Sequence, residues 1–189
     1  KMGKSWMALD IAMSVAIGCD ALGDRACKKG GTLYCALEDN PRRLRRRMVH
    51  VYGDQAAWPK NFHFTTQMKK LDDGGSEQLE NWILDHRPSL IIIDTLVCVR
   101  SASKRRTEYE ADYAALAPLQ RLAGEYGIAI IIVHHQRKMG SEDPLDTVSG
   151  TTGLSGGVDN ILILDRKSHG VTLYGRGREM DDIDITVEL

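Results

Sequence analysis

The chain alternates short, almost wholly apolar segments with longer segments in which apolar residues recur at helical spacing. Short runs of β-branched residues and leucine are typical of strands that are buried on both faces of a parallel sheet. Strands are predicted at residues 32–37, 62–65, 90–95 and 128–133. Helices are predicted at residues 6–17, 41–47, 76–86 and 108–126. This alternation predicts an α/β fold with a mostly parallel central sheet flanked by helices.

The pattern changes after residue 133. A loop is predicted at 139–148, and the Gly-, Ser- and Thr-rich segment 149–157 implies a backbone that bends or closely approaches a partner. Antiparallel closing strands are then predicted at 158–164, 171–174 and 183–187, with a turn near 167–170. A chain of 189 residues, 42% of them hydrophobic, can bury one core, so we expect a single domain over residues 1–189.

Charge and cysteine usage exclude some classes of protein. The net charge of −1 excludes a uniformly basic nucleic-acid coat, so any nucleic-acid contact must come from local clusters of Lys and Arg. The four cysteines include no C-x-x-C pair, and Cys35 and Cys98 lie in apolar segments where buried free thiols are expected. This usage favours a reducing, cytoplasmic environment. No apolar run reaches the roughly 18 residues of a membrane span, so no membrane contact is expected.

The first five residues match the second half of the phosphate-loop signature G-x-x-x-x-G-K-[ST]. In such a loop Gly3 lets backbone N–H groups approach phosphate oxygens, Lys4 carries a positive charge to them, and Ser5 offers a hydroxyl to Mg²⁺. The first half of the loop and its strand are expected upstream of residue 1. The alternative is an ordinary helix start. The expected nucleotide contacts are Met2, Gly3, Lys4, Ser5 and Trp6.

Asp94 ends the apolar run of residues 90–93. A carboxylate at the end of a buried parallel strand is placed as the Mg²⁺-positioning residue of a P-loop NTPase. Together with G-K-S upstream, Asp94 therefore predicts an ATP site in which Ser5 and Asp94 hold Mg²⁺.

A carboxylate pair, Glu38 and Asp39, follows the strand at 32–37. Asp39 or Asn40 is expected to cap the next helix, while Glu38 faces the ligand at the carboxyl edge of the sheet. The position directly after Asp94 could also carry a glutamate that activates water, but Thr95 occupies it. Glu38 is therefore the best-placed candidate for the general base.

Two histidines and several cationic clusters complete the candidate residues. His134 and His135 are adjacent in a strand end and face opposite sides, which disfavours a zinc site. One of them is expected to contact the γ-phosphate, the alternative being a satisfied core histidine. The arginine run at 42–47 favours a solvated helix face over a nucleic-acid site, and residues 100–106 form a basic loop.

Taken in chain order, these motifs resemble the RecA-like hexameric ATPases of the RepA type, which are replicative helicases of plasmids and phages. The matching motifs are G-K-S at 3–5, L-E-D at 37–39, I-I-I-D at 91–94, H-H-x-x-K at 134–138, S-G-T-T-G-L-S-G-G-V-D-N at 149–160 and G-R-G-R-E at 175–179. The resemblance implies a RecA-like P-loop fold, ATP and Mg²⁺ as cofactors, and a homo-oligomer that forms a hexameric ring. It also implies that Glu38 orients the attacking water, Asp94 is the Mg²⁺-linked carboxylate, and His135 senses the γ-phosphate.

The resemblance also places the loops at 100–106 and 139–148 at a central channel that holds single-stranded DNA. The second loop is weakened as a DNA contact by its acidic residues Glu142, Asp143 and Asp146. The expected DNA contacts are Lys104, Arg105, Arg106 and Lys138.

The sequence departs from the family after Val-Asp-Asn, where relatives carry an arginine and Ile161 and Leu162 stand here. This leaves Arg176 and Arg178 as the cationic pair expected to act on the ATP of a neighbouring subunit. The alternative is a surface turn in which both arginines pair with nearby carboxylates, namely Glu179, Asp181 and Asp182.

Two functions therefore remain open. The first is an ATP-driven motor on single-stranded DNA. The second is a RecA-like regulatory or recombinase-type ATPase that switches partners through ring assembly, with DNA dispensable. A scaffold that only binds nucleotide is less favoured, because Glu38 supplies a candidate base.

Overall fold

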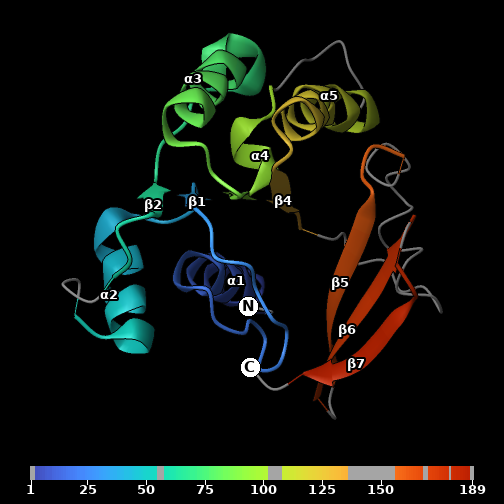
Figure 1. The fold of residues 1–189 in the computed structure, drawn as a ribbon. Helices are drawn as coiled ribbons and strands as arrows, with labels where there is room; N and C mark the ends of the chain where they lie inside the picture. Colours follow the sequence, from blue (N-terminus) through green and yellow to red (C-terminus); the bar gives the residue numbers. More distant parts are fainter. Residues whose placement is uncertain are drawn as a thin grey trace.

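The computed structural model describes residues 3–54, 58–101, 108–135, 156–167, 170–178 and 180–187. Its strands form two sheets, a parallel sheet of order β2-β1-β3-β4 and an antiparallel sheet of order β5-β6-β7 (Figure 1). The parallel strands are β1 (Thr32–Ala36), β2 (Phe62–Thr65), β3 (Leu90–Asp94) and β4 (Ala129–Val133). The antiparallel strands are β5 (Asn160–Lys167), β6 (Gly170–Gly177) and β7 (Ile183–Val187).

Helices cover both faces of the parallel sheet, as the alternating pattern predicts. One face packs against α1 (Lys4–Ile17) and α2 (Pro41–Tyr52). The other packs against α3 (Ser76–His86), α4 (Leu96–Val99) and α5 (Glu108–Tyr126), as Figure 1 shows. The predicted α/β fold with a parallel central sheet is therefore confirmed.

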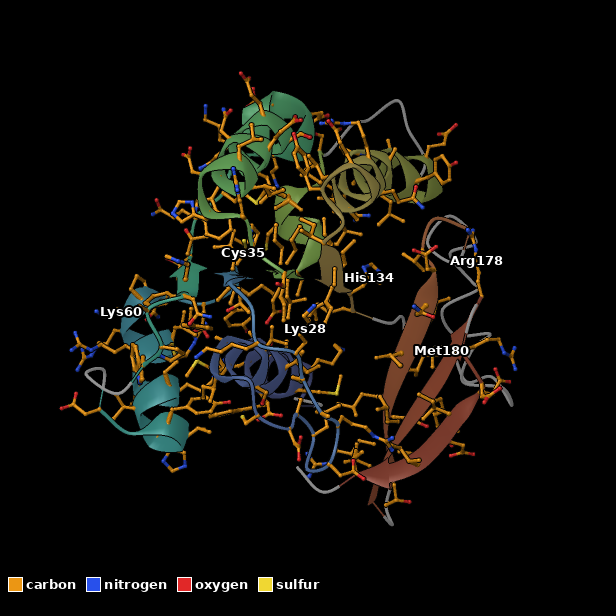
Figure 2. The ribbon with its side chains drawn as sticks, viewed as in Figure 1. Lys28, Cys35, Lys60, His134, Arg178 and Met180 are labelled. Carbon is orange, nitrogen blue, oxygen red and sulfur yellow. The ribbon has the colours of Figure 1, made fainter. Side chains whose placement is uncertain are left out.

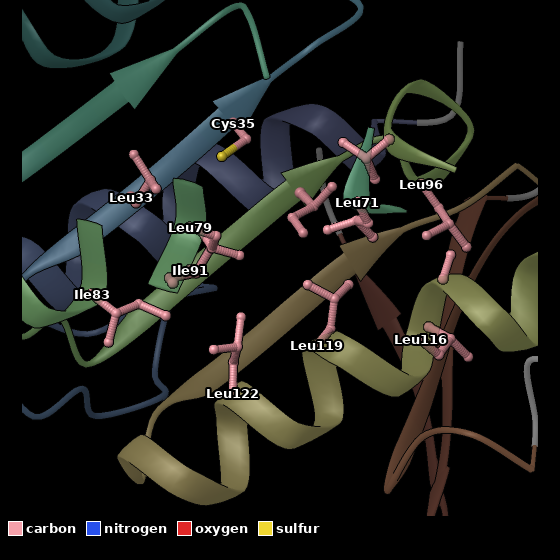
Figure 3. Close-up of a cluster of buried hydrophobic side chains, with 13 residues drawn as sticks. Leu33, Cys35, Leu71, Leu79, Ile83, Ile91, Leu96, Leu116, Leu119 and Leu122 are labelled. Atoms are coloured by element: carbon pink, nitrogen blue, oxygen red, sulfur yellow. The ribbon is translucent and has the colours of Figure 1, made fainter. Parts of the chain in front are cut away.

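The continuous apolar pattern of the strands follows from this two-sided burial. Along β1, Leu33 and Cys35 belong to the core beneath α3 and α5, whereas Tyr34 belongs to the core beneath α1 and α2. The same alternation along β3 leaves Ile92 with no exposed surface. Figure 3 shows one of these two cores, with leucines of α5 projecting toward the sheet. Burying one such side chain contributes about 1.5–3 kcal/mol.

The C-terminal strands form a sheet of their own. β5 and β6 pair antiparallel from Asn160↔Gly177 to Lys167↔Gly170, and β7 pairs with the other edge of β6. Burial alternates along β6, whose residues on one face are buried and those on the other are mostly only partly buried. The covered face carries a small cluster around Leu164 and Leu173, against which Met7 of α1 packs.

Two short elements were not predicted from the sequence. One is α4, a single turn directly after Asp94, and the other is a π-helical turn, η2 (Leu71–Gly75), before α3. Non-helical backbone angles at Asp73 and Gly74 interrupt η2, so it carries no helical periodicity. Cys35 is buried as expected, whereas Cys98 is only partly buried, which corrects that prediction.

Several predicted contacts lie outside the described residues. These are Met2 of the nucleotide site and the four DNA contacts, Lys104, Arg105, Arg106 and Lys138. Within the part of the chain that the structure describes, no helix is both long enough and apolar enough to cross a bilayer.

Candidate functional site

Polar side chains converge where the parallel strands end. Ala36 of β1 pairs with Asp94 of β3, and Asp94 pairs in turn with Val133 of β4, so the three strands end side by side. Their carboxyl ends therefore bring together the residues just beyond them, including Glu38 and His135. α1 packs across these strands and places its N-terminus at the same edge. Ligands of open α/β sheets bind in this position.

The start of α1 can bind an anion. Gly3 precedes the helix with φ 83°, a left-handed conformation that favours glycine, and its carbonyl accepts the N–H groups of Trp6 and Met7. No side chain caps the helix, and its first turn contains no acidic residue. Burial lowers the pKa of Lys4, while the negative charges of Asp94 and Glu38 act in the opposite direction. The structure thus brings Lys4 near both predicted carboxylates.

Asp94 is almost fully buried, with 4% of its surface exposed. The hydroxyl of Tyr34 donates to its Oδ2 at 2.9 Å, and the same hydroxyl lies 3.3 Å from the backbone carbonyl oxygen of Ser5. Burial, together with the charge of Asp94, raises the pKa of Tyr34 well above its usual value. Tyr34 was missed in the sequence because it lies within an apolar strand. Its phenol among aliphatic neighbours was the only available signal.

Glu38 is held by two partners from neighbouring strand ends. The hydroxyl of Thr95 donates to Oε1 of Glu38 at 2.8 Å, and Nε2 of His135 lies 3.2 and 3.3 Å from the two carboxylate oxygens. The carboxylate nevertheless stays accessible, because 46% of the Glu38 side chain is exposed. In the sequence, Thr95 was notable only because it stands where a glutamate base could have been. In the structure it orients Glu38, the predicted base.

Two arginines of α2 bind the loop that follows β1. Asp39 forms ion pairs with Arg43 and, at 3.0 Å, with Arg47, and Arg43 also donates to the carbonyl oxygen of Glu38 at 2.7 Å. Asn40, one of the two predicted caps, accepts the backbone N–H of Arg43. The arginine run is thus only partly a solvated face, because Arg43 and Arg47 stabilise the loop that carries Glu38.

Trp6 joins this network from α1. The guanidinium of Arg47 lies 4.9 Å from the centre of the Trp6 ring, in a cation–π contact. Trp6 follows Ser5 directly, so Arg47 connects the predicted phosphate loop with Asp39.

Arg176 lies in β6 of the antiparallel sheet, and Arg178 follows directly after the end of this strand. Arg176 forms an ion pair with Asp182 at 3.1 Å, and Arg178 lies 3.6 Å from Asp159. Figure 2 shows Arg178 beside this sheet, away from His134 at the end of β4. The structure does not bring either arginine to Lys4, Glu38 or Asp94 of its own chain.

The site residues fit Mg²⁺. Ser5 and Asp94 offer a hydroxyl and a carboxylate, the oxygen ligands that this ion prefers. The described residues contain no group of three side chains that could hold a metal by themselves. A magnesium ion here would therefore depend on nucleotide phosphates to complete its coordination.

A parallel α/β sheet with G-K-S at a helix start and a strand-end aspartate beside it defines a P-loop nucleotide-binding domain. A family model described as an AAA domain matches residues 1–141, and the chain belongs to this family. The chain is thus an ATPase-type domain. The match includes the described site residues from Gly3 to His135, and Arg176 and Arg178 lie beyond it. No curated protein gives a significant match.

Proposed function

We propose that this chain hydrolyses ATP in the presence of Mg²⁺, with Glu38 as the general base. The observation that carries the proposal is the position of the Glu38 carboxylate. It is hydrogen-bonded to Thr95 and His135 at the strand ends, is half-exposed, and acts electrostatically on Lys4. A base must be oriented and accessible to water, and this arrangement supports both requirements.

Each residue then has a separate role. Gly3 and the first N–H groups of α1 bind phosphate oxygens, and Lys4 adds a positive charge beside them. Bound Mg²⁺, held by Ser5 and Asp94, neutralises charge on the phosphates. Glu38 accepts a proton from the attacking water while Thr95 maintains its orientation. His135 contacts Glu38 from β4 and is the proposed sensor of the γ-phosphate.

Nucleotide binding tests the phosphate loop. Replacing Lys4 with Ala removes the cation at the phosphates and should abolish ATP binding measured by isothermal titration calorimetry. The matched control is Lys60→Ala, which removes an exposed lysine at the opposite end of the strands. Unchanged ATP affinity in the Lys4 variant would overturn the assignment.

Turnover tests the base. Glu38→Gln keeps the size and most hydrogen-bonding capacity of the side chain, so ATP binding should persist while steady-state hydrolysis falls by roughly 10²-fold or more. Glu77→Gln, an exposed position on α3, should leave turnover unchanged. If the Glu38 variant hydrolyses ATP within a few-fold of the parent protein, the base is another group.

The resemblance to RepA-type helicases extends the proposal to a hexameric motor on single-stranded DNA. Its support is the motif order, together with the basic residues Lys104, Arg105, Arg106 and Lys138. Replacing the first three with Ala should weaken binding to single-stranded DNA and reduce its dependence on salt. If the parent protein does not bind DNA even at low ionic strength, the partner-switching ATPase becomes the better assignment.

A further inference from the structure

Packing alone does not explain why residue 34 is a tyrosine, because its hydroxyl is not needed to fill the core. Its side chain is fully buried in the middle of β1, within the apolar core between the sheet and α1. A phenylalanine would fill the same space without bringing a hydroxyl into the core. Burying a hydroxyl is unfavourable unless it is hydrogen-bonded. The partners of this hydroxyl therefore indicate why the polar residue is present.

Both oxygen partners of the hydroxyl belong to residues that are predicted to hold magnesium. At 2.9 Å the hydroxyl donates to Oδ2 of Asp94, and the carbonyl oxygen of Ser5 is a second, more distant acceptor at 3.3 Å. These two residues come from different elements, the end of β3 and the first turn of α1. One buried side chain thus contacts both residues that would hold the ion.

The hydrogen bond also distinguishes the two oxygens of Asp94. Among the described residues, Tyr34 is the only donor to this carboxylate, and it occupies Oδ2. A buried carboxylate with one oxygen bound cannot rotate freely about its terminal bond, because rotation would break the bond to Tyr34. The other oxygen, Oδ1, keeps a defined direction and has no described protein donor competing for it.

We propose that Tyr34 is a positioning residue for Mg²⁺, which holds Asp94 through Oδ2 and leaves Oδ1 to the ion. This inference rests on the proposed function, because it assumes that Ser5 and Asp94 bind the metal of a nucleotide complex. It extends that function by making the Mg²⁺ dependence of nucleotide affinity a property of β1 as well as of the phosphate loop.

The experiment is a magnesium titration of nucleotide binding to Tyr34→Phe. Binding of a fluorescent ATP analogue is measured in EDTA and at increasing Mg²⁺. The phenyl ring keeps the packing, so affinity in EDTA should stay within about twofold. The Mg²⁺ concentration for half-maximal enhancement should rise about tenfold, the scale of a hydrogen bond to a charged group.

A matched control is Tyr52, the last residue of α2, whose hydroxyl also contacts a residue of α1. The hydroxyl of Tyr52 lies 3.4 Å from Oδ1 of Asp10, so Tyr52→Phe removes another tyrosine–aspartate contact against α1 that lies away from Ser5. This variant should keep the Mg²⁺ dependence of the parent protein. An equal shift in both variants would mean that general loosening of α1, and not the position of Asp94, causes the change.

A double variant distinguishes the remaining outcomes. If Tyr34 acts through Asp94, Tyr34→Phe should add nothing to the Mg²⁺ defect of Asp94→Asn. An unchanged Mg²⁺ dependence in Tyr34→Phe, with normal binding by the parent protein, overturns this inference and leaves the proposed function intact. Absence of nucleotide binding by the parent protein overturns the proposed function itself.

Discussion

The two sheets of this protein place their charged residues differently. In the parallel sheet, β1 and β3 are buried along their whole length, and the charged groups collect just beyond their carboxyl ends. In the antiparallel sheet, β6 alternates between buried and partly exposed positions, and Arg176 in β6 and Arg178 just after it pair with aspartates at the surface. Among the residues that the structure describes, only the first arrangement concentrates carboxylates and a lysine at one point.

This difference follows from how each sheet is covered. Helices on both faces of the parallel sheet exclude water from its central strands β1 and β3, so charged side chains gather at the ends of these strands. One face of β6 in the antiparallel sheet is only partly buried, and charges can lie along it at little cost. Charges at the strand ends of the parallel sheet are therefore candidates for chemistry. Those on the antiparallel sheet need an additional partner to acquire a function.

The largest expected effect tests whether the antiparallel sheet has such a partner, namely the ATP of a neighbouring subunit. If Arg176 and Arg178 act on the ATP of a neighbouring subunit, their double replacement with Ala should lower turnover by roughly 10³-fold. The unfolding free energy should change by less than about 1 kcal/mol, because both ion pairs are exposed. Steady-state hydrolysis and urea denaturation measure the two quantities.

Subunit mixing then tests whether the arginines act between chains. The double variant mixed with Glu38→Gln should regain partial activity, because some interfaces combine an intact glutamate with intact arginines. If both variants assemble and mixing restores nothing, the arginines are surface residues paired with Asp182 and Asp159.

Truncating a core side chain should destabilise the two sheets to different extents, and these effects should be smaller than that of the arginine replacement on turnover. Ile92→Ala removes a side chain with no exposed surface in the central strand β3, and we expect a loss of about 4 kcal/mol in unfolding free energy. Leu173→Ala lies in the small cluster of the antiparallel sheet, which can collapse more readily, so about 2 kcal/mol is expected. Urea denaturation measures both. Equal losses would contradict the contrast, and Ile92→Val, expected to cost about 1 kcal/mol, serves if the alanine variant does not fold.

The smallest expected effect concerns the cap that starts α2. Asn40→Ala removes the acceptor for the backbone N–H of Arg43 and should cost about 1 kcal/mol. Asn81→Ala, at an exposed position inside α3, should be neutral or slightly stabilising in the same thermal denaturation experiment. A similar loss at both positions would mean that the cap contributes nothing specific to the loop carrying Glu38.

The sequence was informative where one residue pattern determines the outcome. Continuous apolar runs located β1, β3 and β4, and an aromatic segment located β2, each to within a residue or two, and strand ends located Glu38 and Asp94. Contacts between distant residues carry no such pattern. The bonds from Tyr34 to Asp94 and from Thr95 to Glu38 join residues far apart in the chain, so they depend on strand order and side-chain direction. α4 escaped prediction because a single turn is too short to show periodicity.

Side chains alternate between the two faces of β1, and the face opposite Tyr34 carries a thiol whose reactivity can report on opening of the sheet. Cys35 points away from Tyr34 into the opposite core, and burial raises the pKa of its thiol to about 12. At neutral pH only about one thiol in 10⁵ is then ionised, so disulfide reagents should modify Cys35 only when the sheet opens, whereas exposed Cys19 should react at once. The labelling rate of Cys35 would therefore measure how often β1 separates from its helices, and how far bound nucleotide suppresses that opening.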